Sequence, residues 1–149
     1  MRKLLKSCSL LFLVFYFSIS IQAQDQYVQS IGLRAGPYSG LSYKRFITTA
    51  GTIEGIAGFN FTNGRVFTVT GLYEHHFFVN YHLNWYAGGG LSLAAKKGNF
   101  RTIVEAIIGI EYIFKKPPLN FSLDYKPNFH LFSWNYYINE FAMTIRYIF

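Results

Sequence analysis

Residues 119–131, LNFSLDYKPNFHL, alternate between two kinds of side chain along their whole length. The odd-numbered positions hold leucine, phenylalanine, tyrosine and one proline, whereas the even-numbered positions hold asparagine, serine, aspartate, lysine and histidine. Successive side chains of a β-strand point to opposite sides of its sheet. The segment is therefore predicted to be a strand with one apolar face and one polar face.

Seven further segments are predicted strands for the same reason, although glycines blur the two faces of 84–95: 30–36, 40–47, 52–61, 66–74, 84–95, 103–114 and 141–149. The stretches GPYSG, TTAG, TNGR, KKGNFR and KKPPLN between them have the composition of turns, and 75–83 and 133–140 are expected to be longer connections. No segment resembles a crossover helix, so neighbouring strands are predicted to be antiparallel. The predicted fold is all-β, with eight antiparallel strands in up-and-down order.

Residues 1–23 differ from the rest of the chain. Three cations in MRKLLK precede a short apolar run, and IQA ends on a small residue, which is the pattern of a secretory signal peptide cleaved near Ala23. A membrane anchor is the alternative, but the run is shorter than the roughly 20 residues of a spanning helix. We therefore expect residues 24–149 to be the exported domain, and the sole cysteine, Cys8, to leave with the signal peptide.

The composition limits the possible functions. Of the 149 residues, 51% are hydrophobic and only 14% are charged. The chain has 14 basic and 7 acidic residues, and the signal peptide holds three of the basic ones, so the net charge falls from +7 to +4. This modest charge, with no basic run, gives no reason to expect a nucleic-acid partner. No motif predicts a cofactor or a metal site.

The charged residues of the strands decide which face lies inside. Nine of them fall on the polar face: Arg34, Lys44, Glu54, Glu74, Glu105, Glu111, Asp124, Lys126 and Arg146. Small neutral residues separate them, whereas the opposite face is a broad apolar band rich in tyrosine and phenylalanine. Outward apolar bands with aromatic girdles are typical of transmembrane β-barrels. The sequence therefore predicts a closed barrel in which the nine charged side chains form an ion network.

The length of the chain agrees with this barrel. Spanning strands need roughly 9 to 11 residues each, so eight of them fit within residues 24–149. An eight-stranded barrel is just wide enough to be filled by its own side chains, which predicts a packed polar interior without a pore. A soluble periplasmic ligand-binding barrel, with the apolar face inside, remains the alternative.

Residues 141–149, FAMTIRYIF, resemble the C-terminal strand by which bacterial outer-membrane proteins are recognised. GLRAGPYSGLSYKRF, NWYAGGG, IIGIEYIFKKPPLNFSLDYKPNF and TIRYIF also resemble small outer-membrane barrels of the OmpA/OmpX type from Gram-negative bacteria. The resemblance implies export through the inner membrane to the outer membrane, contact with outer-membrane lipid, and recognition of Tyr147 and Phe149 by the barrel-assembly machinery. It implies a structural or surface-interaction role and specifies no surface ligand.

Catalysis is the remaining alternative, because some small outer-membrane barrels modify lipid A with a histidine and a serine. The histidines are His75, His76, His82 and His130, and Ser133 is close to the last in sequence. A spacing of three places His130 and Ser133 on opposite faces of a strand, and adjacent histidines also diverge. The inward carboxylates Glu105 and Glu111 could act as an acid and base pair only if they lay close together, but six residues along one strand separate them by about 20 Å. We therefore predict no catalytic residues and no enzymatic activity.

Overall fold

The computed structural model describes residues 27–60, 65–130 and 139–149, and these form eight β-strands. The strands are β1 (Gln29–Ala35), β2 (Ser39–Phe46), β3 (Gly51–Asn60), β4 (Val66–Phe78), β5 (Leu83–Lys96), β6 (Asn99–Phe114), β7 (Leu119–His130) and β8 (Asn139–Ile148). The expected signal peptide lies outside the described residues, as do most of the TNGR turn and of the connection at 133–140.

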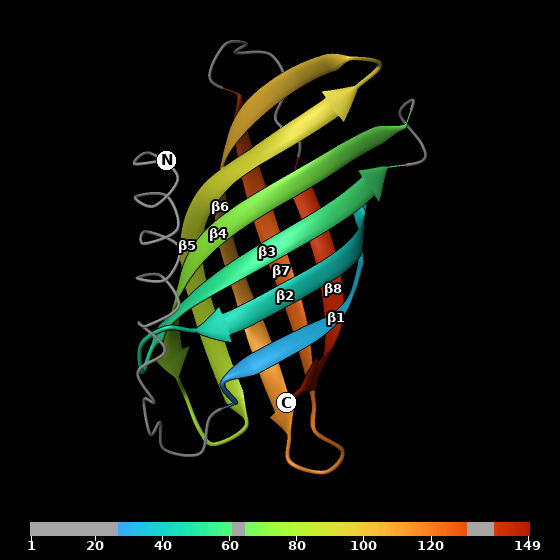
Figure 1. Ribbon diagram of the computed structural model, residues 1–149. Coiled ribbons are helices and arrows are strands. Elements are labelled where there is room, and N and C mark those ends of the chain that lie inside the picture. The colour runs from blue at the N-terminus through green and yellow to red at the C-terminus, as the bar shows by residue number, and fades with distance from the viewer. Residues whose placement is uncertain (1–26, 61–64, 131–138) are drawn as a thin grey trace, which may run out of the picture.

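The strands close into a barrel (Figure 1). Each strand pairs antiparallel with the next in sequence, and β1 pairs antiparallel with β8, where Gly32 lies opposite Arg146. This confirms the closed eight-stranded antiparallel barrel expected from the sequence. Among the described residues, no helix is long and apolar enough to cross a membrane.

The barrel has two ends, which we name by what lies there. The terminal end is where β1 begins and β8 ends, at Gln29 and Ile148. The mouth end is the opposite one, and it includes the turn between β5 and β6 at Lys97 and Gly98, drawn at the top of Figure 1. Both Lys97 and Gly98 have positive φ angles, 46° and 83°, which glycine adopts without steric cost.

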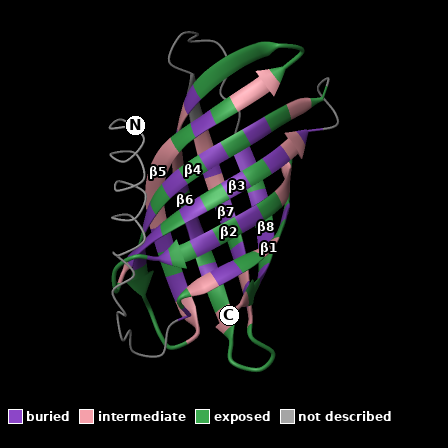
Figure 2. Ribbon diagram, viewed as in Figure 1, coloured by how far each residue is buried: buried purple, intermediate pink, exposed green. Residues whose placement is uncertain are grey.

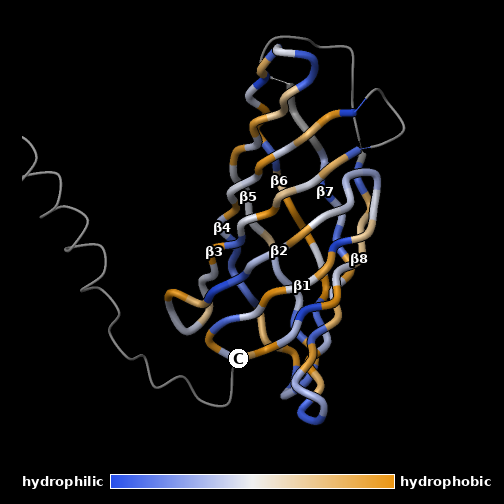
Figure 3. The backbone as a smooth tube through the Cα atoms, turned by 45° about the vertical axis from the view of Figure 1, so that its right-hand side comes forward, coloured by the Kyte–Doolittle hydropathy of each residue, from blue (hydrophilic) through white to orange (hydrophobic). Residues whose placement is uncertain are grey.

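Burial alternates along most of the strand length, apart from the glycine-rich middle of β5 and the beginning of β6 (Figure 2). In β4, for example, Glu74 is buried while Tyr73 and His75 on either side of it are exposed. Hydropathy alternates too, so orange and blue segments follow one another along the strands in Figure 3. The buried face is mostly polar and the exposed face mostly apolar, which is the reverse of a water-soluble sheet.

Several strands extend beyond the bounds expected from the sequence, β6 by four residues to Asn99, and two of the extensions change the interior. β4 continues to Phe78, because His75 and His76 pair with Ala87 and Tyr86 of β5 instead of opening a long connection. β8 begins at Asn139, so Glu140 belongs to a strand and not to the preceding loop. Both extensions add a polar side chain to the interior, namely those of His76 and Glu140.

The glycine-rich part of β5 marks a close approach between strands. A Cβ atom on Gly88 would collide with the backbone oxygen of Tyr73, and one on Gly90 with that of Gly71. Both Tyr73 and Gly71 belong to β4, the strand paired with β5. The glycines are therefore needed for packing of the backbone, in agreement with their location in the middle of a strand.

The interior is not polar throughout. Ile56, Leu72, Tyr86 and Ile107, from β3 to β6, form a buried apolar cluster. These residues lie on the same face as the charged side chains, so they interrupt the alternation of polar and apolar positions. The charged side chains thus share the barrel interior with a small hydrophobic core.

Candidate functional site

All the carboxylate side chains of the described residues lie inside the barrel. Each is at most 5% exposed, and they are Glu54, Glu74, Glu105, Glu111, Asp124 and Glu140. Four basic side chains lie among them, each at most 3% exposed: Arg34, Lys44, Lys126 and Arg146. The structure thus places all nine predicted network residues in the interior and adds Glu140. The ten residues divide into two groups along the barrel.

The first group lies toward the terminal end and contains Arg146, Lys44, Glu54, Glu74 and Glu111. The Arg146 guanidinium forms an ion pair with Glu54. The Lys44 Nζ atom lies 2.7 Å from Glu74 Oε2 and 3.6 Å from Glu54 Oε2. Two bases on β2 and β8 therefore hold two carboxylates from β3 and β4, which ties four strands together through side chains.

Serine hydroxyl groups accept the remaining hydrogen bonds of the Arg146 guanidinium. Its Nε atom donates to Ser42 Oγ at 2.8 Å, and one terminal nitrogen donates to Ser122 Oγ at 2.7 Å. The Ser42 hydroxyl in turn donates to Glu54. A buried charge is tolerated only when it is paired and hydrogen-bonded, and these small polar residues meet that need. They belong to the same polar face that the sequence predicts to lie inside.

Aromatic side chains pack in the interior near the terminal end. Tyr27, just before β1, donates to Glu111 Oε1 at 2.6 Å, and its ring packs edge-on against Phe46. Burial, and next the charge of Glu111, raise the pKa of the Tyr27 phenol, so it stays protonated and donates. His76 stacks on Tyr86, with ring centroids 5.1 Å apart, and is fully buried.

The second group lies toward the mouth end and contains Arg34, Lys126, Glu105, Asp124 and Glu140. Arg34 donates to both carboxylate oxygens of Asp124, at 2.8 and 2.5 Å. Lys126 lies 3.1 Å from Glu105 and 3.1 Å from Glu140, and Arg34 lies 3.4 Å from Glu140. Glu140 therefore bridges the two bases. Each group contains two bases and three carboxylates.

Tyr86 connects the two groups. Its ring lies under the Lys44 ammonium, 4.1 Å from the centroid, and its hydroxyl lies 3.4 Å from Asp124 Oδ2. The side chain is completely buried and also belongs to the apolar cluster. Its position could not be predicted from the sequence, because the glycines that follow it in β5 obscure the alternation there.

This arrangement does not resemble a hydrolytic site. Glu105 and Glu111 do not form an acid and base pair, because they belong to different groups. Glu105 pairs with Lys126, and Glu111 accepts a hydrogen bond from Tyr27. His75 is exposed on the outer face, and His82 precedes β5 and stacks on Tyr112. No three His, Cys, Asp or Glu side chains of the described residues are placed to hold a metal ion. The side chain of His130 and all of Ser133 lie outside the described residues.

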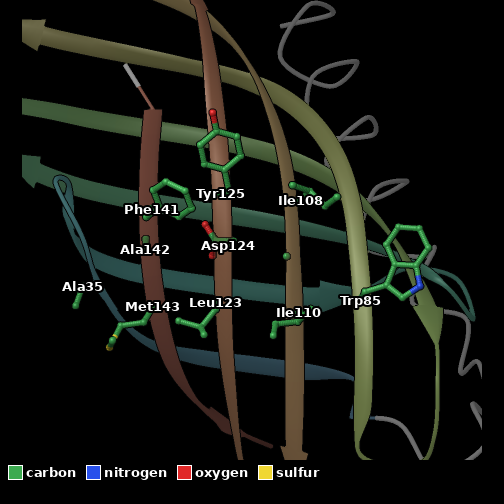
Figure 4. A pocket seen from close by; sticks show the side chains of 11 residues that line it. Ala35, Trp85, Ile108, Ile110, Leu123, Asp124, Tyr125, Phe141, Ala142 and Met143 are labelled. Carbon is green, nitrogen blue, oxygen red and sulfur yellow. The ribbon is translucent and has the colours of Figure 1, made fainter. Parts of the chain in front are cut away.

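The outer wall carries a shallow apolar groove of about 540 Å³ across β5 to β8 (Figure 4). Its two sides are formed by outward rows of side chains, Ile108, Tyr125 and Phe141 in one row, and Ile110, Leu123 and Met143 in the next. Trp85 and Ala35 lie at its two ends, as labelled in Figure 4. Such a surface offers contacts to hydrocarbon and almost none to polar groups.

The fold is similar to that of a solved structure. The crystal structure of the N-terminal β-barrel domain of OprF from Pseudomonas aeruginosa superimposes with a TM-score of 0.71. The match covers 83% of this chain and all of that one, with 14% sequence identity. No family model matches the sequence, and no curated protein matches it. At 14% sequence identity the similarity shows a shared fold, so this chain has the fold of that barrel domain.

Proposed function

We propose that this protein is an integral outer-membrane β-barrel with a structural or surface-interaction role and no catalytic activity. The observation that carries the proposal is the inverted distribution of polarity. Ten charged side chains fill the interior, while residues such as Leu33 and Phe141, 69% and 71% exposed, cover the outside. A membrane supplies the apolar surroundings that such a wall requires, and closure removes the free strand edges that lipid could not satisfy.

A soluble ligand-binding barrel accounts less well for the same residues. Its apolar face would line the cavity, and its charges would face water. Here the outward apolar positions recur on all eight strands, as at Leu41, Leu91 and Ile145. A contiguous apolar surface larger than a few hundred Å² is rare on a soluble monomer.

Cell fractionation tests the location. We expect the protein in the outer-membrane fraction, beginning at Gln24 after cleavage near Ala23, and migrating faster on unboiled than on boiled gels. Recovery of the folded protein in the periplasmic supernatant would contradict the proposal. Unchanged lipid A mass spectra in a deletion strain are expected for a protein without lipid-modifying activity.

We further propose that β8 presents the assembly signal, with Tyr147 and Phe149 as its outward aromatic residues. Both are more than half exposed, at 54% and 59%, and the Phe149 amide donates to the Gln29 oxygen at 3.1 Å. Interfacial aromatics favour the boundary between lipid and water. Deleting Phe149 should lower the yield of heat-modifiable protein in the outer membrane, whereas Phe149→Tyr keeps the ring and should insert normally. Equal yields for both variants would contradict this role.

A further inference from the structure

A second cavity, of about 370 Å³, opens inside the barrel at the mouth end. Its floor includes Ile56 and Ile103, and Lys126 with Glu140 lies at one side. Its rim includes Lys96 and Lys97, where β5 turns into β6. The volume is within the range of small-molecule sites, which begins at about 300 Å³.

The charged side chains that line this cavity, four basic and two acidic, have a net positive charge. Lys96, Lys97 and Arg101 line it and are exposed, and none of them forms an ion pair within the described part of the chain. The two carboxylates in the lining are already engaged, because Lys126 pairs with both Glu105 and Glu140. The three rim cations thus face the cavity without an acidic partner.

The described residues and the two connections at the mouth end offer these cations no other carboxylate side chain. Every carboxylate side chain of the described residues is buried in the interior groups. The connecting sequences 61–64 and 131–138 contain no aspartate or glutamate. An anion from outside is therefore the natural counter-charge, and lysine and arginine bind phosphate or carboxylate through charge-assisted hydrogen bonds.

The remaining lining suits a ligand with hydroxyl groups. Thr68 and Asn99 offer polar groups, and the half-buried Tyr38 offers both an aromatic face and a phenol. Burial, and next the charges of Glu140 and Glu105, raise the pKa of Tyr38, so the phenol remains a donor. Beneath them, Ile56 and Ile103 give an apolar floor against which the C–H groups of a sugar ring can pack. An inorganic anion would leave these contacts unused.

We propose that the mouth cavity binds a small acidic saccharide, with its phosphate or carboxylate held by Lys96, Lys97 and Arg101. The proposal names a class of ligand for the proposed surface-interaction role. It rests on the proposed function in one respect, namely which side of the membrane the mouth end faces. The sugar is either free in the medium or part of a lipopolysaccharide. Binding to the purified protein does not depend on membrane location, so its failure is distinguishable from failure of the fractionation test.

The test is calorimetric titration of the purified, folded protein in zwitterionic detergent at low ionic strength. The probes are glucose 6-phosphate, glucose and inorganic phosphate. We expect glucose 6-phosphate to bind at least tenfold more tightly than either of the others, and its affinity to fall with added salt. Backbone amide shifts should move at Thr68 and Asn99 and not at Leu83. If lipopolysaccharide micelles compete with glucose 6-phosphate for the cavity, the lipid-linked sugar is the natural source. If they do not compete, the free sugar is.

Two triple variants, each of which removes three positive charges, compare the mouth end with the terminal end. Lys96→Gln, Lys97→Gln and Arg101→Gln together should weaken glucose 6-phosphate binding at least tenfold. Arg45→Gln, Lys115→Gln and Lys116→Gln remove two lysines and one arginine at the terminal end, and should change the affinity less than twofold. Equal weakening by both triples, or no difference between glucose 6-phosphate and glucose, would overturn the proposal.

Discussion

The inside and the outside of this barrel are built from the same eight strands and carry opposite charge. The interior holds four bases and six carboxylates, whereas every charged side chain exposed among the described residues is a cation. These exposed cations lie near the two ends: Arg45, Arg65, Lys96, Lys97, Arg101, Lys115 and Lys116. The difference shows that alternation along a strand separates two environments, one in which charges must pair and one in which they are confined to the rims.

The largest difference between the two faces is expected for loss of a buried base. Arg146→Met removes the ion-pair partner of Glu54 and leaves that carboxylate inside the barrel with Lys44 at 3.6 Å. Breaking a buried pair in this way typically costs about 3 to 5 kcal/mol. The measurement is the free energy of unfolding by urea in lipid vesicles. Arg45→Met, at an exposed position of β2, should change it by only about 0.5 kcal/mol; a similar loss for both would mean that the inner charges are not specially paired.

A charge introduced on the outer face gives the next largest effect. Ile108→Arg places a guanidinium in the middle of β6, within the apolar groove, and should cost about 2 to 4 kcal/mol in a bilayer. Phe114→Arg, at the end of the same strand and beside Lys115, should cost only about 0 to 1 kcal/mol. The same unfolding measurement applies to both. If position along the strand makes no difference, the wall does not face a hydrocarbon layer.

Packing density should distinguish the faces at uncharged positions as well. In Gly109→Ala the new methyl group would lie 2.5 Å from the Tyr86 ring and 2.8 Å from the Leu123 oxygen, which predicts a loss of about 1 to 3 kcal/mol. Gly71→Ala has open space around the new methyl group and should be neutral or stabilise the protein by about 0.4 to 1 kcal/mol. Thermal unfolding ranks the two variants, and the opposite ranking would contradict the packed interior.

Loss of a buried acid should have the smallest effect. In Glu111, Oε1 accepts from Tyr27, while Oε2 has no hydrogen-bond partner among the described residues. Glu111→Gln retains the acceptor and relieves part of the excess of carboxylates over bases. We expect the free energy of unfolding to change by about 1 kcal/mol or less. A loss as large as that of Arg146→Met would show that the interior needs all six carboxylates.

The fold was predictable because each strand repeats one simple pattern. In β7 the alternation of Leu123 with Asp124 predicts both the strand and its polar face, and the structure has Leu123 exposed and Asp124 buried. Alternation depends only on the geometry of an extended chain, so it is readable without knowledge of tertiary contacts. The number of strands and their antiparallel order follow from the same signal and from the turns between the strands.

The partners within the interior were less predictable. Glu140 was missed because it comes directly after a segment without alternation, and His76 because its neighbours Phe77 and Phe78 are both apolar. Ile56 and Leu72 lie inside although they are apolar, because they pack with Tyr86 and Ile107 in one buried cluster. Which acid meets which base depends on strand register, and a sequence pattern does not contain that information.

The ladder between β1 and β8 has a consequence for cooperativity. It joins positions such as Ser30 and Ile148, so it closes a loop of nearly the whole described chain. By the logarithmic dependence of loop entropy on length, this costs about 2 kcal/mol more than closing a hairpin of about a dozen residues. The contacts of Arg34 with Glu140 and of Arg146 with Ser42 cross the same seam and become available only when it shuts. Until then β1 and β8 each have a free edge, so the ladder and these side-chain contacts are gained together when the barrel closes.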